Sequence, residues 1–341
     1  MKEKKRIFIE LKANYSCNHN CIYCWTGDLN KKHLTQEMIL ANLQYLMKKF
    51  DNPSYEMEYY LRISGGEFTI RKDCLDILQE VARLNFSVIS LHTNGVRFAE
   101  KDFAKAFLPS IRGVMVSFPS ADPHTYARIT RKGDDFSRAI QGIKNMLKFD
   151  LPVVSNTVIN KLNYRQLPDI ARRIVSLGIP YASFTLPVPD GNMLEMMADV
   201  LPPSIEAVGQ YFLPAKKILE NHGVYWEIPK GPSFPSCFYL GWGGDIPLDY
   251  RSWCDFFEHV YFVDIDHQFE NHTTLKDIAM PDGIKDSGRC GCCVLNPCCE
   301  GVHKLLLGQP GYEIRPVNAE TLYRHFFSFL SMPASGQKEI I

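Results

Sequence analysis

The chain has 341 residues, 38 basic side chains balanced by 38 acidic ones, and 45% hydrophobic residues. This length suits one large α/β domain with a small appendage, and the zero net charge argues against a partner held by bulk electrostatics, such as a nucleic acid. No apolar run approaches the ~20 residues that a bilayer span needs, and the first residues lack the apolar core of a signal peptide. We therefore expect a soluble, cytoplasmic protein with neither a nucleic-acid nor a membrane partner.

Short β-rich runs alternate with helical patterns up to about residue 186. The expected strands cover 6–11, 57–64, 86–93, 113–118, 151–159 and 181–187. The expected helices cover 35–50 (with Thr35 as N-cap), 73–84, 100–108, 136–149 and 165–178. Six β–α steps with short, right-handed connections predict an α/β fold in which a parallel sheet curls into a partial (β/α)6 TIM-like barrel.

The alternation stops after the sixth strand, where the composition changes. A Pro- and Met-rich connection at 187–203 leads into a helix at about 204–222, and cysteine-, aromatic- and glycine-rich segments follow. We expect four regions: the partial barrel at 1–190, a linker and helix at 191–230, a small cysteine-rich α+β extension at 231–320 and a tail at 321–341.

Cysteine usage points to metal chemistry. The chain has 11 cysteines, and their clustering predicts metal or iron–sulfur ligands rather than disulfides in a reducing compartment. Cys17, Cys21 and Cys24 lie in the loop after the first strand, at the sheet edge where such folds build their sites. Three thiolates can hold three corners of a 4Fe–4S cube. A zinc site completed by His19 or His33 is the alternative.

The same loop and a motif at the end of the second strand resemble the radical SAM superfamily, over residues 6 to about 190. Gly65, Gly66 and Glu67 match the family's GGE motif, and Tyr23 precedes the third cysteine as an aromatic residue does in the family. Two glycines permit a close backbone approach, and a carboxylate pairs with an ammonium. The resemblance implies that Glu67 helps to hold the amino group of S-adenosylmethionine and that Tyr23 packs against its adenine.

Residues at the ends of later strands imply further contacts to S-adenosylmethionine. Thr93 and Asn94 close the third strand, as a Thr-Asn-Gly does in many family members. Ser117 ends the fourth strand, where the family often places a ribose-contacting serine, although the common Ser-Leu-Asp-Gly is Ser-Phe-Pro-Ser here.

Further candidate contacts to S-adenosylmethionine lie after the fourth strand and in the fifth. Arg128 and Arg131 both match the arginine that reaches the methionine carboxylate in the family, and the choice between them stays open. Asn156 and Thr157, in the fifth strand, are candidate ribose ligands. The resemblance implies that the cluster, reduced by a flavodoxin- or ferredoxin-type donor, cleaves S-adenosylmethionine to a 5′-deoxyadenosyl radical that abstracts hydrogen from a substrate C–H bond.

The C-terminal cysteines resemble the twitch form of the SPASM extension, which holds one auxiliary 4Fe–4S cluster. Cys237 and Cys254 would join Cys290 and Cys293, with a strand and turn at 259–272 between the two pairs. Four thiolates close such a cluster and suit it to electron transfer.

Other cysteines in this region leave the ligand set open. Cys298 and Cys299 can replace one of the four ligands, and Cys292 is the spare. A second auxiliary cluster is disfavoured, because His303 stands where that pattern expects a cysteine. A zinc knuckle built on Cys290, Cys293, His303 and either Cys298 or Cys299 is the alternative.

The function expected from the resemblance is maturation of a ribosomally made peptide by oxidation, cross-linking or epimerisation. Because only a few residues precede the first strand, a separate protein would have to bind any leader peptide. In an epimerisation, Cys292 or Cys298 would return the hydrogen atom. Dehydrogenation or epimerisation of an aminocyclitol or sugar is the alternative, and a non-enzymatic zinc scaffold is a more remote one.

Overall fold

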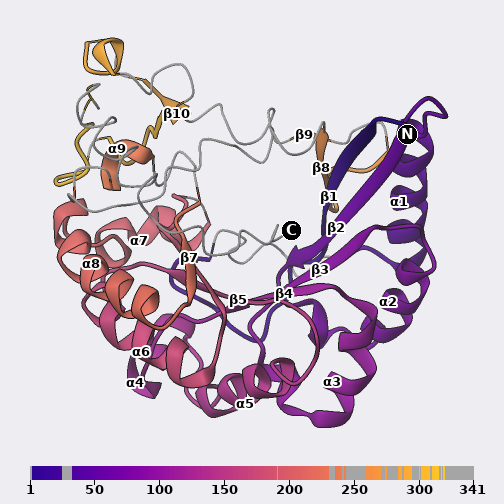
Figure 1. Cartoon of the computed structure of the whole chain (residues 1–341), viewed down its shortest axis with the longest axis horizontal. Coiled ribbons are helices and arrows are strands. Elements are labelled where there is room, and N and C mark those ends of the chain that lie inside the picture. The colour runs from indigo at the N-terminus through magenta and orange to yellow at the C-terminus, as the bar shows by residue number, and fades with distance from the viewer. Residues whose placement is uncertain are drawn as a thin grey trace.

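The structure is a computed structural model with one curved sheet whose outer face is covered by helices (Figure 1). It describes residues 2–24, 33–189, 191–229, 235–239, 242, 259–269, 273–274, 283–285, 288–293, 299, 301–307, 309–314, 316 and 318. Within these ranges, no helix is long and apolar enough to cross a bilayer.

The main sheet has the strand order β7-β6-β5-β4-β3-β2-β1-β8-β9. Its strands are β1 (Lys4–Asn14), β2 (Glu56–Gly65), β3 (Val88–Thr93), β4 (Gly113–Ser117), β5 (Val153–Val158), β6 (Tyr181–Thr185), β7 (Tyr225–Glu227), β8 (His259–Val263) and β9 (Thr273–Thr274). Neighbours from β7 to β8 run parallel, and β9 pairs antiparallel with β8. The end strands β7 and β9 do not pair among the described residues, so the sheet stays open and the predicted partial barrel is confirmed.

Helices follow the strands along the chain and lie outside the sheet (Figure 1). They are α1 (Gln36–Phe50), α2 (Cys74–Ala82), α3 (Lys101–Phe107), α4 (Pro123–Thr130), α5 (Phe136–Met146), α6 (Leu167–Leu177), α7 (Asn192–Val200), α8 (Ile205–Asn221) and the short α9 (Ser236–Tyr239). A small second sheet pairs β10 (Gly283–Ile284) with β11 (Val302–His303). The predicted N-cap of α1 is confirmed, since the Thr35 hydroxyl accepts the Met38 N–H at 3.2 Å.

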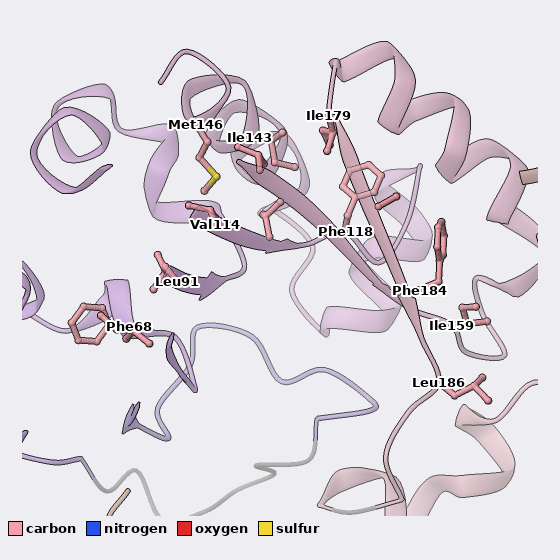
Figure 2. Close-up of a cluster of buried hydrophobic side chains, with 14 of the residues drawn as sticks. Phe68, Leu91, Val114, Phe118, Ile143, Met146, Ile159, Ile179, Phe184 and Leu186 are labelled. Carbon is pink, nitrogen blue, oxygen red and sulfur yellow. The ribbon is translucent and has the colours of Figure 1, made fainter. Parts of the chain in front are cut away.

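The core lies between the sheet and its helices. On β1, Ile7, Ile9 and Leu11 are fully buried in the same hydrophobic cluster as α1. Figure 2 shows side chains of this cluster, among them Leu91, Val114 and Phe184 from three strands. Each such side chain contributes about 1.5–3 kcal/mol by leaving water, which fixes the strand ends at one edge of the barrel.

Two helices lie where the sequence analysis expected loops. Helix α4 begins with Pro123 after Asp122, whose carboxylate accepts the Thr125 N–H at 2.9 Å, so the sequence carries a capping signal for a helix that the predicted elements lack. Helix α7 occupies the segment at 187–203 that was interpreted as a connection. Prolines flank that segment on both sides and mask the helix-forming Met, Leu, Glu and Ala residues between them.

The strand expected in the C-terminal extension belongs to the barrel sheet. β8 pairs in parallel with β1, with Ile9 opposite Tyr261, and turns antiparallel into β9. Its apolar residues Val260 and Phe262 pack with Phe8 and Tyr60 on the inner face of the sheet. The chain therefore returns to the barrel after residue 258, and the other expected region boundaries stay predictions.

Candidate functional site

The first cysteine loop starts where β1 ends, at the carboxyl-terminal edge of the sheet. Its backbone is tied to the end of α4, because Asn20 N–H donates to the Thr130 carbonyl and Ile22 N–H to the Ile129 carbonyl, both at 3.0 Å. This edge also carries the ends of β2 and β3, as expected for parallel neighbours of β1.

The thiols of this loop lie within electrostatic reach of one another. Burial, then the charges of Cys24 and Cys17, raises the pKa of the Cys21 thiol, while Arg131 opposes the shift. Desolvation, then the Glu67 carboxylate, raises the pKa of Cys17 to about 12, although part of that residue reaches solvent. Without a bound cation Cys17 and Cys21 are neutral thiols, and binding a metal cluster would release their protons.

The donor set fits an iron–sulfur cube better than a single ion. Among the described residues, no three His, Cys, Asp or Glu side chains converge on the position of one metal ion. In a cube each thiolate bonds a different iron, so the three sulfurs need not converge. Of the two candidate zinc ligands, the His19 ring lies 3.2 Å from the Asp135 carboxylate, and His33 is exposed.

Two glycines bring the end of β2 against the segment that leads to Cys17. Gly65 has a φ of +107°, and a Cβ on Gly66 would lie 2.2 Å from the Ser16 carbonyl oxygen. The backbone N–H of Gly66 donates to the Asn14 carbonyl at 2.7 Å, and that of Glu67 to Ser16 at 2.9 Å. Only glycine permits this close approach of the two backbone segments, which explains why two glycines stand at the end of β2.

The Glu67 carboxylate is bonded to protein donors, whereas the sequence analysis expected it to pair with the ammonium group of S-adenosylmethionine. The carboxylate is buried and accepts hydrogen bonds from Thr69 N–H and hydroxyl, Thr93 hydroxyl and Asn94 N–H, at 2.6–3.1 Å. Burial raises its pKa, and these donors oppose the shift. The four protein donors occupy the oxygens that the expected pairing would need, so Thr93 and Asn94 are held by Glu67.

The fourth and fifth strands offer polar atoms at the same edge. Ser117 is exposed and lies opposite Asn156 in the β4–β5 register. Of the two ribose-ligand candidates, Thr157 is buried and donates to the Phe118 carbonyl at 2.8 Å. In contrast, Asn156 Oδ1 is buried with no hydrogen-bond partner among the described residues.

Ser183, opposite Asn156 on β6, is a residue that sequence reasoning missed. Its hydroxyl is also buried without a partner within the described ranges. Buried polar atoms are normally paired, so two adjacent orphans mark a place for a polar ligand. A period-2 reading of β6 would have placed Ser183 on the inner face.

Of the two candidate arginines, the structure brings Arg131 to the cysteine loop. Arg131 has a left-handed φ of 55° at the end of α4, and its guanidinium contacts Met196 Sδ at 2.9 Å. Arg128 is exposed on α4. Tyr23 is partly buried against the main core, and burial raises its pKa, with Tyr126 nearby.

Helix α7 is a second missed part of the site, because it clamps the cysteine loop. Asn192 Nδ2 donates to Asn20 Oδ1 at 2.8 Å and to the Cys21 carbonyl at 3.1 Å. The Asn192 backbone N–H donates to the Cys24 carbonyl at 3.0 Å. No spacing rule links residue 192 to residues 20–24, so the sequence alone gave no signal.

The C-terminal cysteines are described only in part. Cys290 and Cys293 lie close enough to Cys299 to raise the pKa of its thiol, after the larger effect of burial. Cys237 on α9 is buried, and Cys292 is exposed, with its thiol donating to the Arg289 carbonyl at 3.2 Å. His303, in the zinc-knuckle alternative, is buried on β11. Cys254 and Cys298 lie outside the described residues.

Comparison with curated proteins finds relatives for about half of the chain. A "Probable GTP 3′,8-cyclase" of Saccharolobus islandicus is 28% identical over 174 residues, which are 50% of this chain and 54% of the relative. A protein of the same description from Methanocaldococcus jannaschii is 29% identical over 170 residues, 48% of this chain and 53% of the relative. The chain thus matches about half the length of these relatives.

Solved structures share the fold at low identity. Native anSMEcpe with bound AdoMet and Cp18Cys peptide aligns with a TM-score of 0.58 and 13% identity, covering 96% of both chains. Streptococcus suis SuiB bound to precursor peptide SuiA gives 0.60 and 13%, covering 92% of this chain and 75% of SuiB. The Radical SAM superfamily model matches residues 13–174, which include the first cysteine loop and the ends of β1 to β5 but not β6 or α7. Over residues 13–174 this chain is therefore similar to the radical SAM superfamily.

Proposed function

We propose that the chain is a radical SAM enzyme whose Cys17, Cys21 and Cys24 hold a 4Fe–4S cluster that binds S-adenosylmethionine. The observation that carries this proposal is the contact between the first cysteine loop and the ends of β2 and β3. Gly66 and Glu67 hydrogen-bond to the segment before Cys17. When bound and reduced by an external flavodoxin- or ferredoxin-type donor, the cluster supplies the electron that cleaves S-adenosylmethionine into methionine and a 5′-deoxyadenosyl radical.

The chain's own residues bind and orient the S-adenosylmethionine. The side-chain oxygens of Asn156 and Ser183, which have no hydrogen-bond partner among the described residues, are proposed to accept hydrogen bonds from hydroxyl groups of the ligand. Arg131 supplies a positive charge beside Cys21, suited to the methionine carboxylate. The Gly65–Glu67 segment is the proposed binding element for the amino group, through its backbone, since the Glu67 carboxylate is engaged with protein donors. Tyr23 and Ser117 complete the proposed contacts to adenine and ribose.

An auxiliary 4Fe–4S cluster in the C-terminal region is part of the proposal. Cys237, Cys290 and Cys293 are its proposed ligands together with Cys254, and Cys298 or Cys299 is the replacement ligand. The proximity of Cys290 and Cys293 to Cys299 supports a shared site. The exposed thiol of Cys292 suits a spare cysteine or a hydrogen-atom donor rather than a ligand.

A peptide is the proposed substrate, modified by oxidation, cross-linking or epimerisation. Two proteins of the same fold, anSMEcpe and SuiB, have been solved with peptides bound. A separate leader-peptide-binding protein is then a proposed partner. A small-molecule substrate is the second candidate, supported by the likeness of half the chain to probable GTP 3′,8-cyclases.

Anaerobic reconstitution tests the proposal. About eight irons per chain, falling to about four in the Cys17→Ala/Cys21→Ala/Cys24→Ala variant with loss of 5′-deoxyadenosine formation, would support both clusters. Zinc in place of iron, without 5′-deoxyadenosine, would establish the zinc scaffold instead. Incubation with candidate peptides and sugars, followed by mass spectrometry, then separates the two substrate classes.

A further inference from the structure

The Glu67 carboxylate joins the end of β2 to the end of β3. It is 1% exposed, and Thr93 Oγ1 lies 3.0 Å from both of its oxygens. The Asn94 backbone N–H donates to Glu67 Oε2 at 2.7 Å, the shortest backbone bond to this carboxylate. The two strand ends therefore cannot separate without leaving a buried carboxylate short of donors, which is costly.

The Asn94 side chain carries this link onward to the cysteine loop. Its Nδ2 donates to Asn18 Oδ1 at 2.7 Å and lies 4.0 Å from Cys17 Sγ, within reach of a sulfur acceptor. Its Oδ1 accepts the Val96 N–H at 3.1 Å, which fixes the orientation of the amide. The His19 backbone N–H, 3.3 Å from Cys17 Sγ, is a second donor to the same sulfur.

We propose that Glu67 and Asn94 act as coupled positioning residues for the Cys17 thiolate. Glu67 fixes the backbone of Asn94, and the Asn94 amide then holds the loop through Asn18 and donates to the Cys17 sulfur. This inference rests on the proposed function, which is what assigns Cys17 as a cluster ligand. Hydrogen bonds to cluster sulfurs stabilise the more negatively charged reduced state, so the Asn94 amide raises the reduction potential of the cluster.

The coupling is tested first on metal-free protein, by urea unfolding of Glu67→Gln, Asn94→Ala and the double variant. Each single variant is expected to lower the unfolding midpoint, and the double variant to lower it by no more than the Glu67→Gln variant does. Strictly additive shifts would overturn the coupling. If Glu67→Gln does not fold, Thr93→Val removes one donor to the carboxylate at nearly constant volume and replaces it in the cycle.

The effect on the cluster is tested by EPR-monitored redox titration of reconstituted protein. Asn94→Ala is expected to keep its iron and to shift the midpoint potential of the first cluster to more negative values. Asn145→Ala is the matched control. Asn145 is also a buried asparagine that links two elements, since its Nδ2 donates to the Phe98 carbonyl at a distance of 2.9 Å, and it belongs to α5 rather than to the cysteine loop. An unchanged potential in Asn94→Ala, or an equal shift in the control, would overturn the role of Asn94.

Failure of the proposed function gives a different result. Wild-type protein would then take up no 4Fe–4S cluster at Cys17, Cys21 and Cys24, whereas the unfolding experiment would still report the coupling of Glu67 to Asn94. If instead the wild-type protein binds the cluster, and the Asn94→Ala and Asn145→Ala variants both show the wild-type midpoint potential, the proposed function stands and only the positioning role is removed.

Discussion

The two cysteine regions of this chain are built in different ways. The three cysteines of the first loop fall within eight residues and are held from β2, α4 and α7 by hydrogen bonds. The C-terminal cysteines extend over about 60 residues, from Cys237 to Cys299, and of these Cys290 and Cys293 lie within electrostatic reach of Cys299. The entropic cost of closing a loop grows with its length, so the barrel preorganises the first set, whereas the proposed auxiliary set would need bound metal to hold its distant cysteines together.

The largest effect is expected from removing one ligand in each region. Cys21→Ser should reduce 5′-deoxyadenosine formation to background, because no other loop thiol can replace this ligand. Cys290→Ser should instead lose about four irons while the EPR signal of the S-adenosylmethionine-bound cluster persists. Loss of that signal in Cys290→Ser would show that the two regions are not independent.

The next largest effect is expected from a substitution at the end of β2 that disturbs its contact with the first cysteine loop. Gly66→Ala places a Cβ 2.2 Å from the Ser16 carbonyl oxygen, so the backbone must shift. We expect a loss of about 2–4 kcal/mol in the free energy of unfolding, measured in urea. Gly133→Ala is the control, since its Cβ would meet no atom of the described residues within 4 Å and should change stability by no more than about 0.5 kcal/mol. Equal losses would contradict the close approach.

A smaller effect is expected at the clamp from α7. Asn192→Ala removes two side-chain hydrogen bonds to the cysteine loop and should cost about 1 kcal/mol. Hydrogen exchange at residues 20–24 should accelerate in metal-free protein. Lys161→Ala also removes a bond to α7, from an exposed Nζ to the Ala198 carbonyl at 2.8 Å, and should leave exchange in the loop unchanged. Equal acceleration would mean that α7 acts on the loop as a whole helix.

The smallest effect is expected at Cys292. Because this thiol is exposed and bonded to the Arg289 carbonyl, Cys292→Ser should leave the iron content of reconstituted protein unchanged, as measured by colorimetric assay. A loss of about four irons would make Cys292 an auxiliary ligand and reassign the C-terminal set.

Much of the barrel could be predicted from the sequence because its signals are local. Short β-rich runs between helical patterns located the first six strands, and Thr35 marked the start of α1. The place of β8 could not be predicted, because a five-residue apolar strand pairs equally well in a hairpin or beside β1. The strand order in a sheet depends on contacts between segments that are far apart in the chain.

The candidate site was predicted less completely than the fold. The cysteines and the Gly65–Glu67 motif carry a recognisable spacing, so they were found. The contacts of Asn192 and Ser183 join residues far apart in the chain, and the choice of Arg131 over Arg128 depends on how α4 ends. The bonding of Glu67 to Thr93 and Asn94 likewise required the geometry of two strand ends.

The pairing of β8 with β1 has a consequence for synthesis on the ribosome. The strand that leads into the first cysteine loop has one permanent neighbour, β2, soon after it emerges, but the partner on its other side arrives about 250 residues later. At ~5–20 residues per second, that edge of β1 waits roughly 10–50 s with unpaired N–H and C=O groups. During this interval it is a template for pairing with another nascent chain, so aggregation during expression should depend on how quickly translation reaches residues 259–263.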